Sequence, residues 1–207
     1  LGSGDYEASV EFFYKQTSNY SEYKDGADFL NNPIIETSVL QGDQESYGVE
    51  LLLKKKRGKL DGWIAYTYSR SFVHVDGPND WDKINNGNRY PSNYDIPHVV
   101  NSVINYNFSR RFILSGVVTY QTGRPATFPV SVYYIEDIAT VDYFERNRFR
   151  IPDYFRTDLS LTIEGNLRKK KPLHSSWMFS LYNATGRKNA YSVFFVSEEG
   201  RIKRYKY

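Results

Sequence analysis

Seven runs of this chain alternate apolar and polar residues with a period of two, and this pattern restricts the possible folds more than any other feature. In the first run, Val10 and Phe12 lie on one face and Glu11 lies on the other. A period of two is that of a β-strand with one apolar and one polar face. The apolar rows of the later runs begin at Tyr47, Ile64, Val100, Phe112, Leu159 and Trp177. Each run has roughly ten residues, the length that a tilted strand needs to cross a bilayer.

Aromatic residues lie mostly at the ends of the apolar rows, as Tyr6, Tyr14 and Trp177 do. The 207 residues include 19 Tyr, 13 Phe and 3 Trp, although the mean hydropathy is only −0.60. Tyrosine suits a boundary at which one end of the side chain is apolar and the other is wet. An aliphatic band between two aromatic girdles is typical of the outside of a transmembrane β-barrel, whereas a soluble sandwich more often centres its aromatic residues. We therefore expect an all-β, antiparallel transmembrane barrel.

The connections between the runs are alternately short and long. The short ones are 57–60, 109–111 and 165–174, and the long ones are 18–44, 74–97 and 122–152. Structureless connections of more than about 15 residues are uncommon in compact domains. Bacterial barrels have short periplasmic turns and long extracellular loops. The chain is therefore expected to expose three long loops at one end of the barrel.

Charge follows the same division. Basic clusters at 54–57, 110–111 and 168–171 fall at the short turns, where we expect them to be solvated near a membrane surface. The net charge of +3 is too balanced for a dedicated nucleic-acid-binding protein, so no nucleic-acid partner is expected. The absence of cysteine excludes disulfides and thiolate metal sites.

The sequence offers little that suggests catalysis. Its three histidines are scattered without metal-ligand spacing, and it contains neither a Gly-rich phosphate loop nor a nucleophile elbow. Glu7, Glu11 and Glu50 share the polar side of their runs and could do acid–base work, but a polar barrel lining accounts for them more simply. The segments 122–125 and 183–186 are expected to form turns in which glycine adopts a positive φ. No catalytic residue, metal or cofactor is therefore expected, and the protein is not expected to be an enzyme.

The long loops contain the best candidates for ligand binding, because loops on a rigid scaffold are where function usually lies. Aromatic rings beside Asn and Arg can stack on and hydrogen-bond a sugar, a siderophore or a peptide. The same residues could equally pack the loops against themselves. The candidates are Trp81, Tyr90, Tyr94, Arg124, Tyr133 and Arg148.

Six segments of the chain form an ordered set: Ser46–Leu51, Gly62–Ser69, Asp95–His98, Tyr120–Pro125, Arg150–Tyr154 and Asp158–Leu161. Together they resemble consecutive strands and loops of TonB-dependent outer-membrane receptors of the type found in Bacteroidetes. The stretch Tyr182–Asn189 resembles the segment just before the last strand of these receptors. Each motif is short, and the order and spacing of the whole set make the resemblance specific.

The resemblance implies a multi-pass outer-membrane transporter that takes up a nutrient with energy supplied through TonB. It implies a plugged barrel of about 22 strands, of which residues 1–207 would be the C-terminal portion, roughly strands fifteen to twenty-one. The plug domain and the earlier strands are then expected to be absent. The implied partners are outer-membrane lipid, the plug domain and TonB, with a surface lipoprotein as a further candidate.

Two other hypotheses remain open at this point. One is a complete small barrel of about eight strands with an adhesin, structural or enzymatic role. The other is a soluble β-rich carbohydrate-binding module, in which the apolar faces would pack against each other. A free strand edge at 6–15 would favour part of a larger barrel over a closed small one, because open edges do not persist in lipid.

Overall fold

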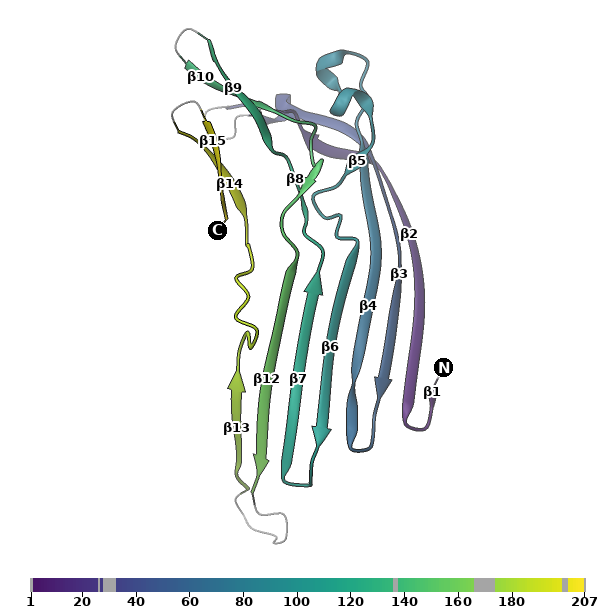
Figure 1. Ribbon diagram of the computed structural model, residues 1–207. Coiled ribbons are helices and arrows are strands. Elements are labelled where there is room, and N and C mark those ends of the chain that lie inside the picture. Colours follow the sequence, from purple (N-terminus) through teal and green to yellow (C-terminus); the bar gives the residue numbers. More distant parts are fainter. Residues whose placement is uncertain are drawn as a thin grey trace.

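The computed structural model describes residues 2–25, 27, 33–135, 138–165, 174–198 and 201–206. Seven antiparallel strands lie side by side in a tall curved wall (Figure 1). They are β2 (Tyr6–Tyr23), β3 (Val39–Lys55), β4 (Leu60–His74), β6 (His98–Asn107), β7 (Phe112–Gln121), β12 (Tyr154–Glu164) and β13 (Ser176–Leu181). Two short strands, β1 (Gly2–Ser3) and β5 (Tyr90–Pro91), pair with β2 and β4. These seven strands coincide with the seven alternating runs, so that prediction is confirmed.

The register of the strands places all the apolar rows on one side of the wall. Val10 pairs with Leu51 and Leu51 with Tyr66. The row continues through Val100 and Tyr120 on the next two strands. We call this side the apolar face and the opposite one, which contains Ser9, Leu52 and Asn101, the polar face. A slip of one residue between any two strands would break the row.

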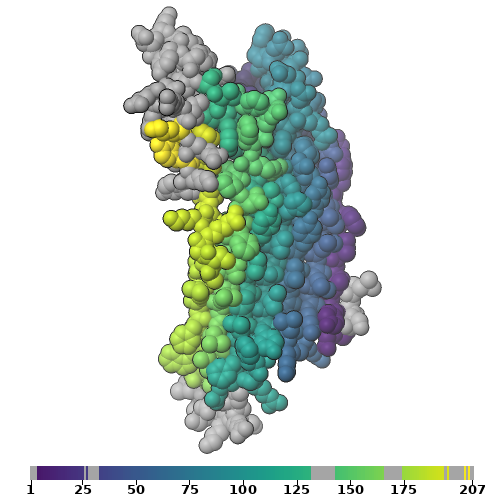
Figure 2. Space-filling view, in the orientation of Figure 1, coloured from purple at the N-terminus to yellow at the C-terminus, as the bar shows by residue number. Residues whose placement is uncertain are grey.

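The apolar face is not covered by a second layer in the part of the chain that the structure describes. Val10, Leu53, Ile64 and Leu181 are each at least 44% exposed. Figure 2 shows the strands packed into a continuous wall from β2 to β13. A soluble sandwich would bury this face against another sheet, so the fold is that of a transmembrane barrel wall, as predicted.

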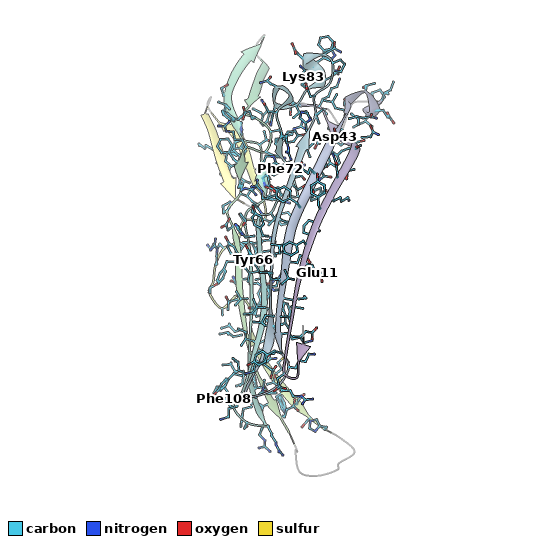
Figure 3. The ribbon with its side chains drawn as sticks, turned by 90° about the vertical axis from the view of Figure 1, so that its right-hand side faces the viewer. Glu11, Asp43, Tyr66, Phe72, Lys83 and Phe108 are labelled. Atoms are coloured by element: carbon cyan, nitrogen blue, oxygen red, sulfur yellow. The ribbon has the colours of Figure 1, made fainter. Side chains whose placement is uncertain are left out.

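The two ends of the wall differ as expected for the connections that the structure describes, and most of the third short connection, 165–174, lies outside the described residues. Residues 56–59 and 108–111 make tight turns at one end, the short-turn end (Figure 1). At the other end, the long-loop end, lie the first loop (24–38), the second loop (75–97) and the third loop (122–153). Seen from the side, the wall has Phe108 near the short-turn end and Lys83 near the long-loop end (Figure 3). The basic clusters 54–57 and 110–111 are at the short-turn end, and 168–171 lies outside the described residues.

The expected connection 18–44 is too long, because the strands on either side continue into it. β2 extends to Tyr23 and β3 starts at Val39, with an irregularity between Thr17 and Tyr20 where Asn19 has a φ of 56°. Beyond Thr17 most residues of both strands are polar, and Leu40 and Tyr20 are apolar exceptions that pack in a small core. The alternation therefore disappears although the hydrogen-bonded ladder continues. The ladder is therefore longer than the pattern that revealed it.

Smaller elements fill the long-loop end. The first loop contains the 3-10 helix η1 (Ile35–Ser38), and the second contains η2 (Asp80–Asp82) and η3 (Asn85–Gly87). The third contains β8 (Pro125–Ala126), β9 (Pro129–Ile135), β10 (Ile138–Tyr143) and β11 (Phe149–Arg150). Beyond β13, the strands β14 (Val193–Glu198) and β15 (Arg201–Lys206) form a separate hairpin. Among the described residues, no helix is long and apolar enough to cross a membrane.

Candidate functional site at the long-loop end

The second loop folds back onto the polar face of the wall and is anchored there by a small core. Tyr90 pairs with Val73 in the ladder between β5 and β4. Both side chains are buried with Val75, Ile84 and Leu40, none of them more than 7% exposed. Five apolar side chains thus hold the loop against the ends of β3 and β4. The second loop therefore lies against the polar face at the long-loop end of the wall.

A fully buried carboxylate joins the second and third loops to the wall. Asp95 in the second loop accepts hydrogen bonds from Arg70 Nε (3.0 Å) and from the backbone N–H of Ser71 (2.8 Å), both on β4. Its other oxygen accepts from Arg150 in β11. Arg150 also donates to the backbone carbonyls of Asp95 (2.7 Å) and Gly123 (2.9 Å). A buried charge is tolerated only when it is paired and hydrogen-bonded, and Asp95 satisfies both conditions.

A second ionic cluster joins all three loops. Arg146 in the third loop lies 2.6 Å from Asp25 and 3.5 Å from Glu22, and its side chain is only 13% exposed. Its backbone N–H donates to Asn85 Oδ1 (2.7 Å), while Asn85 Nδ2 donates back to its carbonyl (3.1 Å). Lys24 reaches Asp82 at 3.5 Å. The loops therefore form one connected structure above the wall.

Asn147 adds a further link between the second and third loops. It is 4% exposed and adopts a φ of 59°, a left-handed conformation that asparagine tolerates better than most residues. Its side-chain amide donates to the carbonyl of Pro91 (2.8 Å) and to Asn93 Oδ1 (2.9 Å). Its backbone N–H donates to Thr127 Oγ1 (3.1 Å). A side chain that cannot make these bonds would disconnect the two loops here.

The predicted ligand-binding residues occupy different environments. Trp81 on η2 and Tyr94 are 71% and 76% exposed. Arg148 is exposed, pairs with Glu145, and places its guanidinium 4.8 Å from the ring centre of Phe144. Tyr133 lies in β9, and its side chain is outside the described residues.

Tyr90 differs from these candidates because it lies in the small core, only 2% exposed. Its hydroxyl has no hydrogen-bond partner among the described residues. Burial and the neighbouring Glu22 carboxylate raise the pKa of this phenol, so it stays protonated. Its position makes it a support for the loops and not a part of their surface.

Arg124 lines a pocket of about 330 Å³ between the third loop and the segment after β13. Its guanidinium donates to the carbonyl of Tyr191 (2.9 Å) and lies 5.8 Å from that ring's centre. Tyr154, Gln121 and Asn189 contribute further polar groups to the lining. Asn189 also pairs with the backbone of Phe155 through two bonds of 2.9 Å, which holds the segment in place. The pocket thus combines a cation, aromatic rings and amides.

The turn 122–125 beside this pocket needs glycine for a different reason from the one expected. Gly123 does not adopt a positive φ, whereas Gly186 in the other predicted turn does, with a φ of 62°. A Cβ on Gly123 would instead overlap the carbonyl of Ile151. Close backbone approach, a known use of glycine, allows Asp153 to accept from the Gly123 N–H (2.9 Å). That bond holds the pKa of Asp153 below its usual range.

Tyr154, Asn189 and Tyr191 were not among the predicted site residues. They converge only because β7 and β12 are neighbours and the segment after β13 turns up beside β12. Nothing in their local sequence distinguishes them from other tyrosines and asparagines of the chain. Their relation to Arg124 becomes visible only in three dimensions.

An apolar outer face, short turns at one end and connected long loops at the other define a transmembrane barrel of the outer-membrane type. Residues 1–184 match the family model described as TonB dependent receptor-like, beta-barrel, and the chain belongs to this family. No curated protein and no solved structure matches the chain. At the level of the family, the protein is an outer-membrane receptor and transporter.

Proposed function

We propose that residues 1–207 are the C-terminal part of the barrel of a receptor that imports a nutrient with TonB-supplied energy. The observation that carries this proposal is the connected loop structure over the polar face of a wall whose other face is apolar. Such an arrangement presents a shaped surface to the exterior and a polar wall to whatever passes inward. The protein catalyses no covalent step in this proposal.

The edges of the sheet support a barrel larger than these strands alone. Within the residues that the structure describes, the sheet runs from β1 to β13, and no strand pairs with residues 9–22 on the outer side of β2. Unpaired backbone groups are very costly in lipid, so both edges must pair with further strands. A barrel of about 22 strands would provide them and leave room for a plug.

The ligand is proposed to contact Trp81, Tyr94, Arg124, Tyr133 and Arg148, with Tyr90 supporting them from below. Trp81 and Tyr94 offer exposed rings, and Arg124 offers a guanidinium beside Tyr191. Rings and fixed donors of this kind stack on flat ligand surfaces and orient them. A polar, partly aromatic nutrient such as a metal chelate or an oligosaccharide fits this chemistry.

The experiment uses cells that produce the full-length protein, supplied with a panel of haem, ferric siderophores, cobalamin and oligosaccharides. Depletion of one compound from the medium should depend on the protein and should stop when a protonophore collapses the proton gradient. The double variant W81A/Y94A should weaken that uptake, whereas T17A, on the wall, should not. Uptake that continues after the gradient is collapsed would contradict the TonB-driven mechanism. A surface lipoprotein, if it covers the loops, should co-purify with the protein in the same cells.

A further inference from the structure

A groove of about 300 Å³ lies on the apolar face near the short-turn end, where β2, β3, β4 and β6 meet. Its sides are Leu53, Leu60, Ile64 and Ile104, each at least 40% exposed. Gly62, with a φ of 138°, contributes no side chain between them. The result is an apolar channel in the membrane-facing surface.

A positive charge lies at the end of this groove nearest the turns. Lys55 lines it, and its Nζ is 5.6 Å from the ring centre of Tyr6, which lines it too. The next two basic residues are neutralised: Lys56 lies 2.9 Å from Glu7, and Arg57 lies 3.9 Å from Asp5. Within the described ranges, Lys55 forms no ion pair. Its ammonium therefore faces the membrane boundary without a carboxylate.

The one acidic residue of the lining does not cancel this charge at the groove. Asp61 belongs to the polar face and accepts from Asn105 Nδ2 (2.8 Å) and Asn107 Nδ2 (2.6 Å). Lys59, Arg110 and Arg111 are further cations at the same end of the wall. Basic residues at a membrane surface attract anionic lipid by about 1 kcal/mol each. The groove thus combines an apolar channel with a cation at the level of the lipid headgroups.

We propose that this groove binds one anionic phospholipid of the leaflet at the short-turn end. One acyl chain lies along Leu53, Ile64 and Ile104, and the phosphate contacts Lys55. Tyr6 places its ring beside the ammonium, and tyrosine is enriched at the membrane–water interface. The inference requires only that the apolar face meets the membrane, so it is independent of the transported ligand.

Native mass spectrometry of the full-length protein in a neutral detergent tests this inference. The protein is mixed with phosphatidylglycerol or with phosphatidylcholine, and the fraction that retains one lipid is measured. K55Q removes the cation, I104W fills the channel, and K59Q removes a cation of the same rim that does not line the groove. Heat-modifiable migration on a gel verifies that each variant is folded. Should I104W fail this test, I104F takes its place.

The wild-type protein should retain phosphatidylglycerol in preference to phosphatidylcholine. K55Q should weaken phosphatidylglycerol retention about fivefold, the ratio that corresponds to about 1 kcal/mol, and K59Q should leave it nearly unchanged. I104W should weaken retention of both lipids. Equal losses in K55Q and K59Q would mean diffuse attraction to the basic rim and would overturn the proposal. So would retention that ignores the headgroup charge, or that is insensitive to filling the channel.

Discussion

Replacing Asp95 should loosen the attachment of the second and third loops to the wall while leaving the barrel strands folded. The carboxylate accepts hydrogen bonds from Arg70, from the Ser71 N–H and from Arg150. Each bond to a charged group contributes about 1.5–3 kcal/mol. The Asp95 side chain is fully buried, but those of Arg70 and Arg150 are 27% and 28% exposed. Water can therefore hydrate the two guanidinium groups when the carboxylate is removed, which lowers the cost. We therefore expect D95A to cost about 3 kcal/mol, the lower bound for breaking a buried pair.

Hydrogen exchange of the full-length protein in detergent measures this cost. A local loss of about 3 kcal/mol corresponds to roughly 100-fold faster exchange of the amides in 75–97 and 144–152. D95N keeps one acceptor oxygen and the shape of the side chain, so its effect should be smaller, about tenfold. D80N is the control, because Asp80 is exposed and lies 3.8 Å from its partner, Lys83. Unchanged exchange in D95A would refute the idea that Asp95 holds the loops.

Three further predictions test the faces of the wall, its packing and its pH response. Arginine at Leu51, on the apolar face, should cost about 2–4 kcal/mol in folding into lipid vesicles, and arginine at Leu52 clearly less; equal costs would contradict the assigned faces. G48A should destabilise the barrel by about 1–3 kcal/mol in urea unfolding. The added Cβ would lie 2.6 Å from the Phe13 ring and would overlap the Tyr68 carbonyl. An unchanged unfolding midpoint would show that the strands can shift to accommodate the methyl group. Since the pKa of Asp153 is lowered in the folded protein, its charge stabilises at neutral pH, and the stability difference from D153N should shrink as pH falls below about 4; a difference that grows on acidification would reverse the assigned sign.

The strands were predictable because a period of two is a local property of the sequence. Val10, Leu51 and Ile64 identify the apolar face from their neighbours alone, and pairing then assembles the rows. The continuation of β2 to Tyr23 was missed because a strand beyond the bilayer has no apolar row to reveal it. Prediction from alternation therefore recovers the part of a barrel strand that lies in the membrane.

The loop contacts were not predictable, because they join residues distant in sequence. Asp95 is 25 residues from Arg70 and 55 from Arg150. Composition also cannot separate Tyr90 from Tyr94, of which one is 2% and the other 76% exposed. The difference follows from the pairing of β5 with β4, a two-residue ladder that no pattern in the sequence predicts. The sequence could therefore place the candidate ligand residues in loops, but it could not predict which of them are exposed.

The ion pairs of Asp95 and Arg146 have a consequence for how quickly and how selectively a molecule is captured. Because these contacts order the loops during folding, little further conformational entropy needs to be lost when a ligand arrives. A surface that is already shaped accepts a molecule without a slow rearrangement, so association can approach the rate of encounter. It also cannot mould itself around a poorly matching compound. The protein is therefore expected to discriminate by shape at first contact, as a rigid template does.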